Sequence, residues 1–388
     1  MQTSNQRKQN DAMYIRDPVF QDIKIDDVKS KLIDTRILQR LKYIKQMGFS
    51  YIVNMGATGT RFEHSLGTMK VTDEIASRIF PSKEKENEEL AIVGLLHDIG
   101  HTPFSHETEE TFIKTLHKTH EQIGYDLLNG EIKDIINDHG LSFSKIRRYF
   151  QGSGKGQIVT GPLGSDRIDY LIRDSYHTGV AYGVIDYTKI KNEITFAKNN
   201  VAIYASGLEG AESMLIARYY MYISVYLHKT SEIAASMFRK ALEMAIEKGE
   251  IDPNNAARYT DDYAMYELQK LPSSSEMINK ILNRRIFKLV AEIKTQDKDG
   301  ITSEEAASAL SAAGLDVSEF TVFENNLKGA NDDILVVDRQ KKKLGNLSEI
   351  SKLFNVLTTL VNERKAIAVA CTEKKFGIAN SAIKKLYG

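Results

Sequence analysis

The sequence predicts a mostly α-helical protein that ends in a small α+β domain. Two observations predict this fold class. Apolar residues recur at helical spacing through most of the first 286 residues. After about Phe287 the pattern changes, and the β-rich pieces 333–337 and 366–370 stand between helical segments. We therefore expect a disordered lead-in (1–12), a helical core (13–286) and an α+β C-terminal domain (287–388).

The elements of the core follow in order from local patterns. Met13–Phe20 predicts a short extended piece that ends at a proline turn. From Leu32 to Met47 the apolar spacing predicts one helix, with Gly48 as its C-cap. The charged run 83–89 predicts the solvated start of a helix that continues into the apolar run 90–96.

The second half of the core is expected to be helical as well. Residues 211–248 form a long and largely helical stretch whose tyrosines are core residues by default. The glycine-rich segment 152–156 lacks the spacing of a phosphate-binding P-loop, and no strand precedes it, so we interpret it as a loop. The basic run 341–343 predicts a turn between strands.

Composition excludes several classes of site. The 388 residues contain 52 Lys and Arg against 52 Asp and Glu, which gives no global attraction to nucleic acid or to an anionic membrane. Cys371 is the single cysteine, so an internal disulfide and a cysteine metal cage are excluded. No apolar run approaches the roughly 20 residues of a membrane helix. We expect a cytoplasmic protein with no membrane partner and no strong binding of nucleic acid.

A His97-Asp98 pair closes the apolar run 90–96 and predicts a metal site. Adjacent helical residues point about 100° apart, so one metal can use both only near a helix end that faces a cleft. The remaining ligands then come from other helices, and the segments around His64 and Asp166 are the obvious suppliers. Imidazole and carboxylate suit a first-row transition ion with open positions for water and substrate, whether iron, manganese, zinc or nickel.

Histidines also gather after this pair. The turn 97–106 contains Pro103, which ends the first helix, after which His106 can begin another. This predicts three imidazoles, His97, His101 and His106, around one bend. A lone histidine is more often a core or surface group, but this density is hard to explain by packing.

Charged residues near these segments suit a phosphate. Arg61 lies one helical turn before His64, which places a cation near the metal. In the helix that begins at Asp166, one face is apolar and the other is polar. For Asp169, Arg173 and Asp174 the alternative is a salt-bridge ladder within the helix, and for the last two it is equally plausible.

At this point the residues resemble a known family, the HD-domain deoxynucleoside triphosphate triphosphohydrolases. The similarity covers most of residues 13–240, and its most specific segments are Arg61-Phe62-Glu63-His64-Ser65-Leu66-Gly67 and Pro103-Phe104-Ser105-His106. It extends through Asp17-Pro18, Tyr43 to Gln46, His97-Asp98, Thr119 to Gln122, Asp166 to Tyr170 and Tyr226 to Lys229.

The resemblance implies a role for each matching residue. The family cleaves between the 5′ oxygen and the α-phosphorus of a dNTP, and releases a deoxynucleoside and triphosphate. Mg²⁺ or Mn²⁺ would accompany the nucleotide phosphates. The implied metal ligands are His64, His97, Asp98 and Asp166, the implied catalytic residues are His101, His106, His120 and Glu121, and the implied substrate contacts are Gln46, Arg61, Arg167, Tyr170, Arg218 and Tyr226.

The chemistry agrees with this set. A triphosphate carries about four negative charges, so a neutral protein needs a local group of cations. A sugar alkoxide is a poor leaving group, and His106, with an ordinary pKa of about 6.5, is the candidate acid that protonates it.

The chain departs from the family where specificity is decided. In a vertebrate member of this family a leucine follows the sugar-binding glutamine, where this chain has Met47, and a glutamine contacts the base, where this chain has Leu227. Base preference and selection against ribose therefore stay open.

The resemblance also suggests regulation and assembly. Residues matching Asp34 and Gln39 bind a guanine-nucleotide or dNTP effector in some relatives, which are homo-oligomers, while the arginine of that site is Lys42 here. Two alternatives stay open: another HD phosphohydrolase, acting on ribonucleotides, signalling nucleotides or nucleic acid, and a nucleotide sensor without catalysis.

Overall fold

The computed structural model describes residues 13–294, 301–325 and 333–387, so the expected lead-in 1–12 lies outside the described residues. Helices dominate the first half. Its elements are β1 (Met13–Asp17), β2 (Gln21–Ile25), α1 (Asp27–Ile33), α2 (Arg36–Arg40), η1 (Leu41–Tyr43), η2 (Gly48–Ile52), α3 (Arg61–Ile79), α4 (Glu84–Leu96), η3 (Ser105–Glu107), α5 (Glu109–Leu116), α6 (His120–Leu127), α7 (Glu131–Asp138), α8 (Phe143–Phe150), η4 (Gly154–Gly156), α9 (Gln157–Thr160) and α10 (Ser165–Thr178).

The second half adds more helices and two further small sheets. Its elements are η5 (Ala181–Gly183), α11 (Tyr187–Glu193), β3 (Ile194–Ala197), β4 (Asn200–Tyr204), η6 (Ala205–Gly207), α12 (Leu208–Met221), the π-helical turn η7 (Tyr222–Tyr226), α13 (Lys229–Glu247), α14 (Pro253–Ala256), α15 (Asp261–Lys270), α16 (Ser275–Leu282), β5 (Lys288–Lys294), α17 (Ser303–Ala312), β6 (Phe320–Asn325), β7 (Leu335–Val337), β8 (Lys343–Asn346), α18 (Leu347–Ile350), α19 (Lys352–Asn362), β9 (Ala366–Cys371), η8 (Glu373–Lys375) and α20 (Phe376–Tyr387).

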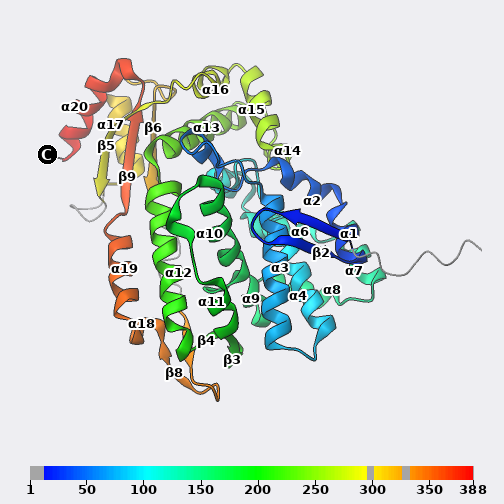
Figure 1. Ribbon diagram of the computed structural model, residues 1–388. Coiled ribbons are helices and arrows are strands. Elements are labelled where there is room, and N and C mark those ends of the chain that lie inside the picture. The colour runs from blue at the N-terminus through cyan, green and yellow to red at the C-terminus, as the bar shows by residue number, and fades with distance from the viewer. Residues whose placement is uncertain (1–12, 295–300, 326–332, 388) are drawn as a thin grey trace, which may run out of the picture.

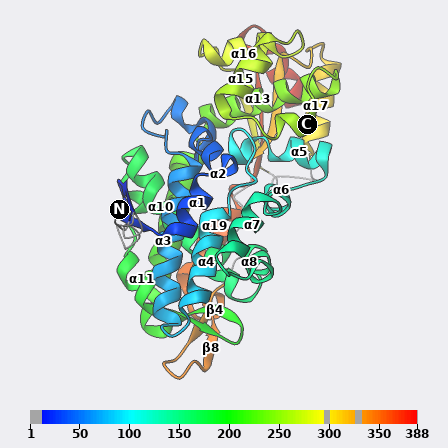
Figure 2. The same cartoon turned by 90° about the vertical axis from the view of Figure 1, so that its right-hand side faces the viewer.

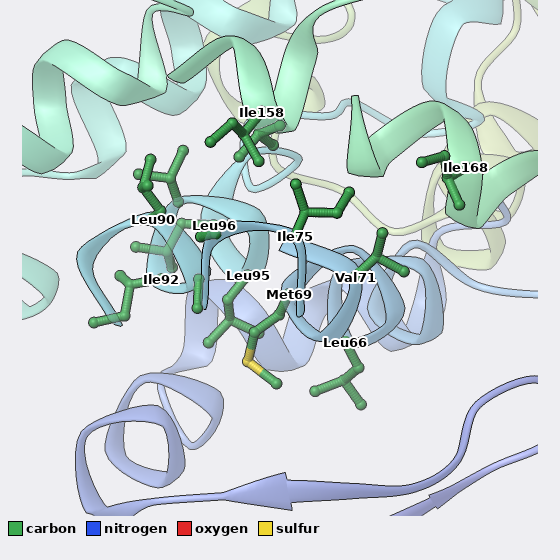
Figure 3. Close-up of a cluster of buried hydrophobic side chains, with 14 of the residues drawn as sticks. Leu66, Met69, Val71, Ile75, Leu90, Ile92, Leu95, Leu96, Ile158 and Ile168 are labelled. Carbon is green, nitrogen blue, oxygen red and sulfur yellow. The ribbon is translucent and has the colours of Figure 1, made fainter. Parts of the chain in front are cut away.

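The packed pair of α3 and α4 forms the centre of the largest core. Leu90, Leu95 and Leu96 are fully buried, as expected for a helix that is apolar all round. The two helices approach closely at Gly94, where a Cβ would lie 3.0 Å from the Cα of Met69. Figure 3 shows this core, to which α9 and α10 add Ile158 and Ile168. The tight packing fixes the helix ends that carry the candidate site.

The single helix predicted over 32–47 is wrong. The chain leaves the helix after Ile33, and Thr35 adopts an extended conformation as the N-cap of α2, with its hydroxyl accepting the N–H of Leu38. A 3-10 turn then follows, so the helical spacing is real but is divided between short pieces. A threonine that can cap a new helix outweighed the continuous apolar periodicity.

The other predicted elements are largely confirmed. Residues 13–17 form a strand, and the charged run after Lys83 begins α4. The stretch 211–248 is helical but is interrupted after Tyr226, where α13 begins at Lys229. The glycine-rich segment 152–156 ends in a short 3-10 turn, and the run 341–343 lies at the turn that enters β8.

The residues after 287 contribute strands to two separate sheets. β5, β9 and β6 form a sheet covered by α17 and α20 at one end of the molecule, while β7 and β8 join β3 and β4 in a sheet at the other end (Figures 1 and 2). β7 pairs in parallel with β4, matching Ala202 with Leu335. The helix α19 runs beside α12 between the two ends (Figure 1). The mostly helical fold with small sheets is confirmed, and the predicted C-terminal segment 287–388 contributes to both ends.

Asp261, the first residue of α15, holds together two loop segments that are far apart in the sequence, one at Lys45 and one at Phe104. The carboxylate of Asp261 is fully buried and accepts the backbone N–H groups of Lys45, at 2.8 Å, and Phe104, at 2.7 Å. Burial raises the pKa of Asp261 to about 6. A buried carboxyl that is protonated more readily in the folded state than in the unfolded state makes stability depend on pH.

We expect this group to favour the folded protein at low pH. Because its folded pKa lies above the unfolded value of about 3.9, the native state binds more protons between these values, and the contribution is lost as the pH rises through about 6. The advantage of the wild type over Asp261→Asn in unfolding free energy should fall by about 2 kcal/mol between pH about 4.5 and about 7.5. Urea unfolding of both proteins at several pH values measures it. A difference that stays constant with pH would contradict the assignment.

Candidate active site

The end of α4 presents the predicted His97-Asp98 pair. His97 is the C-cap of α4, and its Nδ1 donates to the carbonyl oxygen of Gly94 at 2.8 Å. This hydrogen bond fixes the ring and leaves Nε2 as an acceptor that faces His64 on α3. The two Nε2 atoms are 3.1 Å apart.

The four predicted metal ligands converge on one place. Asp166 Oδ1, from the first turn of α10, lies 3.1 Å from His64 Nε2 and 3.7 Å from His97 Nε2. The carboxylate of Asp98 lies 3.3 Å from His97 Nε2 and 3.5 Å from His64 Nε2. Metal–nitrogen and metal–oxygen bonds are about 2.0–2.2 Å long, so donor atoms at these separations can share one ion. His64, His97 and Asp166 therefore fit a transition-metal site, and Asp98, whose carboxylate also pairs with Arg61, lies beside them.

A buried chain of charges orients His64. Its Nδ1 donates to Asp169 Oδ2 at 2.7 Å, and Arg173 donates two hydrogen bonds to the same carboxylate, at 2.8 and 2.9 Å. Arg173 also donates to Asp17 on β1 at 2.7 Å. Gly67 makes room for this arrangement, because a Cβ there would lie 1.8 Å from Asp169 Oδ1. The chain sets the tautomer that leaves His64 Nε2 free to bind a metal.

The sequence indicated only part of the role of Asp169 and Arg173. Asp169 and Arg173 do form a salt bridge within one helix, but both are fully buried and act on His64. Asp174, in contrast, accepts the hydroxyl of Tyr226 at 2.7 Å. A signal was present in the spacing, since Asp169 follows Asp166 by three residues and lies on the same helix face.

The electrostatics of the site favour a cation. Burial alone would lower the pKa of His64, but hydrogen bonds to Asp166 and Asp169 raise it to about 10. Burial opposes ionisation of Asp98, yet the neighbouring charges of His97 and Arg61 hold its pKa well below the ordinary value. Carboxylates that stabilise positive charge on an imidazole stabilise a bound metal ion in the same way.

Arg61 begins α3 and joins the metal ligands to the following turn. Its guanidinium donates to Asp98 Oδ2 at 2.7 Å and to the hydroxyl of Ser105 at 2.9 Å. Phe104 and Ser105 both have positive φ, near 57° and 58°, which is strained for residues with a side chain. The contacts of Arg61 and Asp261 hold this turn, which positions His106.

A second group of histidines lies beside the metal ligands. The rings of His101 and His120 stack, with centroids 4.1 Å apart, and the ring of His106 lies edge-on to both. His101 Nε2 is 3.2 Å from Asp98 Oδ1, so the two groups are contiguous. His97, where the bend begins, lies beside the same oxygen of Asp98 as His101 but pairs with His64. His120, which the bend does not contain, joins His101 and His106 because α6 packs back onto the loop at Gly100.

Glu109, which the sequence did not indicate, organises this histidine group. Its carboxylate contacts Nδ1 of both His106 and His120. Desolvation within the site lowers the pKa of His106, although its side chain is 53% exposed, whereas for His120 the hydrogen bond to Glu109 outweighs burial and raises the pKa. The predicted Glu121 is largely exposed, with one oxygen 3.4 Å from His120 Nε2. The group thus combines imidazoles of different proton affinity.

Tyrosines and arginines gather near Asp166, whose charge acts on Tyr170. The rings of Tyr170 and Tyr226 are 6.4 Å apart, and Arg218 lies over the ring of Tyr222, 5.5 Å from its centroid. Burial raises the pKa of the Tyr170 hydroxyl, and the positive charges of Arg218 and Arg167 oppose that rise. Both predicted arginines therefore lie close enough to act on one side chain of the site.

Three buried polar atoms of the site have no hydrogen-bond partner among the described residues. They are Gln46 Oε1, His101 Nδ1 and Asp174 Oδ1. Burial raises the pKa of Asp174 to about 6. Buried polar groups are nearly always satisfied, so orphaned atoms grouped around one site indicate a polar ligand.

The residues predicted to bind an effector lie outside this group. Asp34 follows α1 and is exposed, and the amide of Gln39 donates to the carbonyl of Ile33 at 2.8 Å. Lys42 is exposed and lies over the ring of Phe62, 4.6 Å from its centroid. The effector assignment stays a prediction.

Comparison with known proteins agrees with this geometry. Residues 61–174 match the HD domain, and residues 185–386 match the HD associated region. Within the described parts of the chain, no helix combines the length and apolar character needed to cross a bilayer.

Relatives are found in archaea and in eukaryotes. An uncharacterized protein of Methanocaldococcus jannaschii is 37% identical over 278 residues, which span 71% of this chain and 58% of that protein. The human deoxynucleoside triphosphate triphosphohydrolase SAMHD1 is 28% identical over 384 residues, which span 78% of this chain and 60% of that protein. The chain thus spans less than two thirds of these two relatives.

Solved structures show the same fold. A hypothetical protein from Aquifex aeolicus superposes with a TM-score of 0.78 at 30% identity, covering 96% of this chain and 100% of that chain. A phosphohydrolase from Bacteroides thetaiotaomicron superposes with a TM-score of 0.76 at 26% identity, covering 93% of this chain and 100% of that chain.

Proposed function

This chain belongs to the HD-domain proteins that carry an HD-associated region, and we propose that it is a metal-dependent phosphohydrolase that cleaves deoxynucleoside triphosphates. One observation carries the proposal. The four predicted metal ligands lie together with Arg61 and with the group of His101, His106 and His120. The products would be a deoxynucleoside and inorganic triphosphate.

The metal ligands would place the ion beside the α-phosphate. His64, His97, Asp98 and Asp166 would hold the ion, which when bound lowers the pKa of a water and draws negative charge from the phosphate. Arg61 is fixed by Asp98 and Ser105, so its guanidinium is oriented before substrate binds.

The histidine group and the arginines would neutralise the triphosphate. A single phosphodiester needs fewer cations than Arg61, Arg167 and Arg218 together supply, so the set favours a free triphosphate. Mg²⁺ or Mn²⁺ would accompany the phosphates. Within the histidine group, His120 already has a raised pKa and would add positive charge.

The orphaned atoms would recognise the sugar. Asp174 Oδ1 and Gln46 Oε1 are acceptors, and a sugar hydroxyl is a donor that satisfies one of them. Tyr226, held by Asp174, would pack against the deoxyribose ring. The raised pKa of Asp174 reflects burial that such a hydroxyl group would compensate.

A product assay tests the proposal. The purified chain with Mn²⁺ is given each dNTP and each rNTP, and nucleoside, monophosphate and diphosphate are separated by chromatography. We expect deoxynucleoside and triphosphate as the products. The variant His97→Ala/Asp98→Ala should not form them, whereas the control His139→Ala, which changes a surface histidine paired with Asp27, should form them at the wild-type rate. Release of a monophosphate or a diphosphate, or no turnover of a metal-loaded protein, would refute this reaction.

His106 is expected to act as the general acid. Its Nδ1 faces Glu109, so Nε2 can donate a proton to the departing 5′ oxygen, and a bound triphosphate would raise its lowered pKa. His106→Ala should lower kcat on dNTPs by about 10²–10⁴-fold. On a p-nitrophenyl phosphodiester, whose leaving group needs no proton, the loss should be much smaller. An equal loss on both substrates would exclude the acid role.

We also propose that Asp34, Gln39 and Lys42 bind a guanine-nucleotide or dNTP effector in a homo-oligomer. The resemblance described above supports this proposal, and Asp34 and Lys42 are accessible. Turnover measured with and without GTP over a range of enzyme concentrations tests it. Identical rates under all these conditions would refute it.

A further inference from the structure

A second pocket lies among α2, α6 and α14, which are close together in Figure 1. Its volume is about 550 Å³, within the range of small-molecule sites. None of the residues assigned above to the metal, the substrate or the predicted effector lines it. The apolar part of its wall is made by Ile37, Ile99, Leu116, Ile123 and Leu127.

The charged part of the wall is strongly basic. It contains Arg36, Arg40, Arg258 and Lys118 against one carboxylate, Asp126. Lys118 and Asp126 pair with each other at 2.7 Å. Arg36 and Arg258 are exposed, and their side chains form no hydrogen bond or ion pair with any described residue. Three guanidinium groups therefore line one cavity, and none of them forms an ion pair with a carboxylate of the described residues.

Arg40 is the central group of the three. Its guanidinium donates to the backbone carbonyls of His101, Ala257 and Arg258, which are neutral acceptors. Burial lowers the pKa of Arg40 to about 10, the charge of Asp261 opposes this effect, and the smaller effect of the neighbouring charge of Arg258 adds to it. An anion in the pocket would stabilise all three charges at once.

We propose that this pocket binds an organic phosphate, such as a nucleotide, with the phosphate groups on Arg36, Arg40 and Arg258. The non-phosphate part of the ligand would lie against the isoleucine and leucine side chains. Planar guanidinium groups suit phosphate oxygens, and the apolar wall favours a ligand with a carbon framework over a bare inorganic anion. The binding claim does not depend on the proposed reaction.

The pocket is lined by the same two segments that carry His101 and His120. Ile99 lies in the loop between Asp98 and His101, and Ile123 and Leu127 lie on α6, which His120 begins. The loop and the helix touch at Gly100, where a Cβ would lie 2.1 Å from the carbonyl oxygen of His120. A ligand in the pocket therefore contacts both segments that carry these histidines and would restrict their motion.

Calorimetric titration of ATP and GTP into the full chain tests the binding. The test variant is Arg36→Glu/Arg258→Glu, which changes two exposed side chains that form no hydrogen bond or ion pair with the described residues. Controls are Arg285→Glu, an exposed arginine outside the pocket, and Lys42→Glu, in the predicted effector group. We expect the wild type and Arg285→Glu to bind one nucleotide per chain more than the test variant, whose affinity for this site should fall at least about 100-fold. Lys42→Glu should keep this site and lose only what binds at the effector group.

The outcomes separate this site from others. If nucleotide binds neither the active site nor the effector group, the wild type should show one site and the test variant none, which still supports the pocket. Equal stoichiometry and affinity in the wild type and the test variant would overturn the proposal, as would loss of the site in Lys42→Glu alone. Inorganic triphosphate is the last probe. If it binds the pocket as tightly as ATP does, the apolar wall does not contribute to binding, and the proposal that the ligand is an organic phosphate would be overturned.

A hydrogen-exchange measurement tests the link to the active site. Saturating ATP should slow amide exchange in residues 97–101 and 120–127 of the wild type by at least about tenfold, and should leave it unchanged in Arg36→Glu/Arg258→Glu. The same slowing in both proteins would show that the effect arises from a different site and would overturn the coupling.

Discussion

Replacing His64 by glutamine is expected to remove the metal and to lower hydrolysis by at least about a thousandfold. The Nε2 of His64 is within 3.5 Å of His97, Asp98 and Asp166, so this ring lies at the centre of the ligand group. Its loss also removes the donor that Asp169 accepts at 2.7 Å. Elemental analysis after dialysis, together with the product assay, measures both effects.

A surface histidine provides the control for this change. His139→Gln alters a group that pairs with Asp27 at 3.0 Å at the surface, and it should change neither metal content nor rate. A His64→Gln protein that retains the wild-type amount of metal would show that His64 is not a ligand.

Replacing Arg173 by methionine is expected to lower the free energy of unfolding by about 3–5 kcal/mol. Arg173 is fully buried and pairs with Asp169 and with Asp17 on β1, so the variant leaves two buried carboxylates without their cation. The cost arises from those uncompensated charges rather than from the lost attraction alone. Urea unfolding measures it.

Two further variants show whether burial is the cause. Arg16→Met removes the ion pair with Asp22, whose side chains are 75% and 51% exposed, and should change stability by less than about 1 kcal/mol. Adding Asp169→Asn and Asp17→Asn to Arg173→Met should recover part of the loss, because the buried negative charges are then removed. Equal effects of Arg173→Met and Arg16→Met would contradict this explanation.

The buried chain from Asp17 through Arg173 and Asp169 to His64 links stability to function. It connects β1, near the N-terminus of the described chain, to the metal ligands on α3 and α10. A change anywhere along it should alter the orientation of His64. Gly67, which allows α3 to approach Asp169, belongs to the same arrangement.

The sequence by itself determined the class of fold and indicated which residues are the candidate metal ligands. The apolar run 90–96 required a buried helix, and the His97-Asp98 pair at its end required partners from elsewhere, which the structure places at His64 and Asp166. Helical periodicity and ligand chemistry are local properties, so they can be deduced without coordinates.

Only the tertiary structure decided which distant groups meet. Glu109 and His120 join His101 and His106 because α6 packs onto the loop at Gly100, and β7 joins β4 across more than a hundred residues of sequence. The basic pocket likewise combines Arg36 and Arg40 with Arg258. Such contacts depend on how whole helices pack, and a periodic pattern specifies which face of a helix is buried but not which partner covers it.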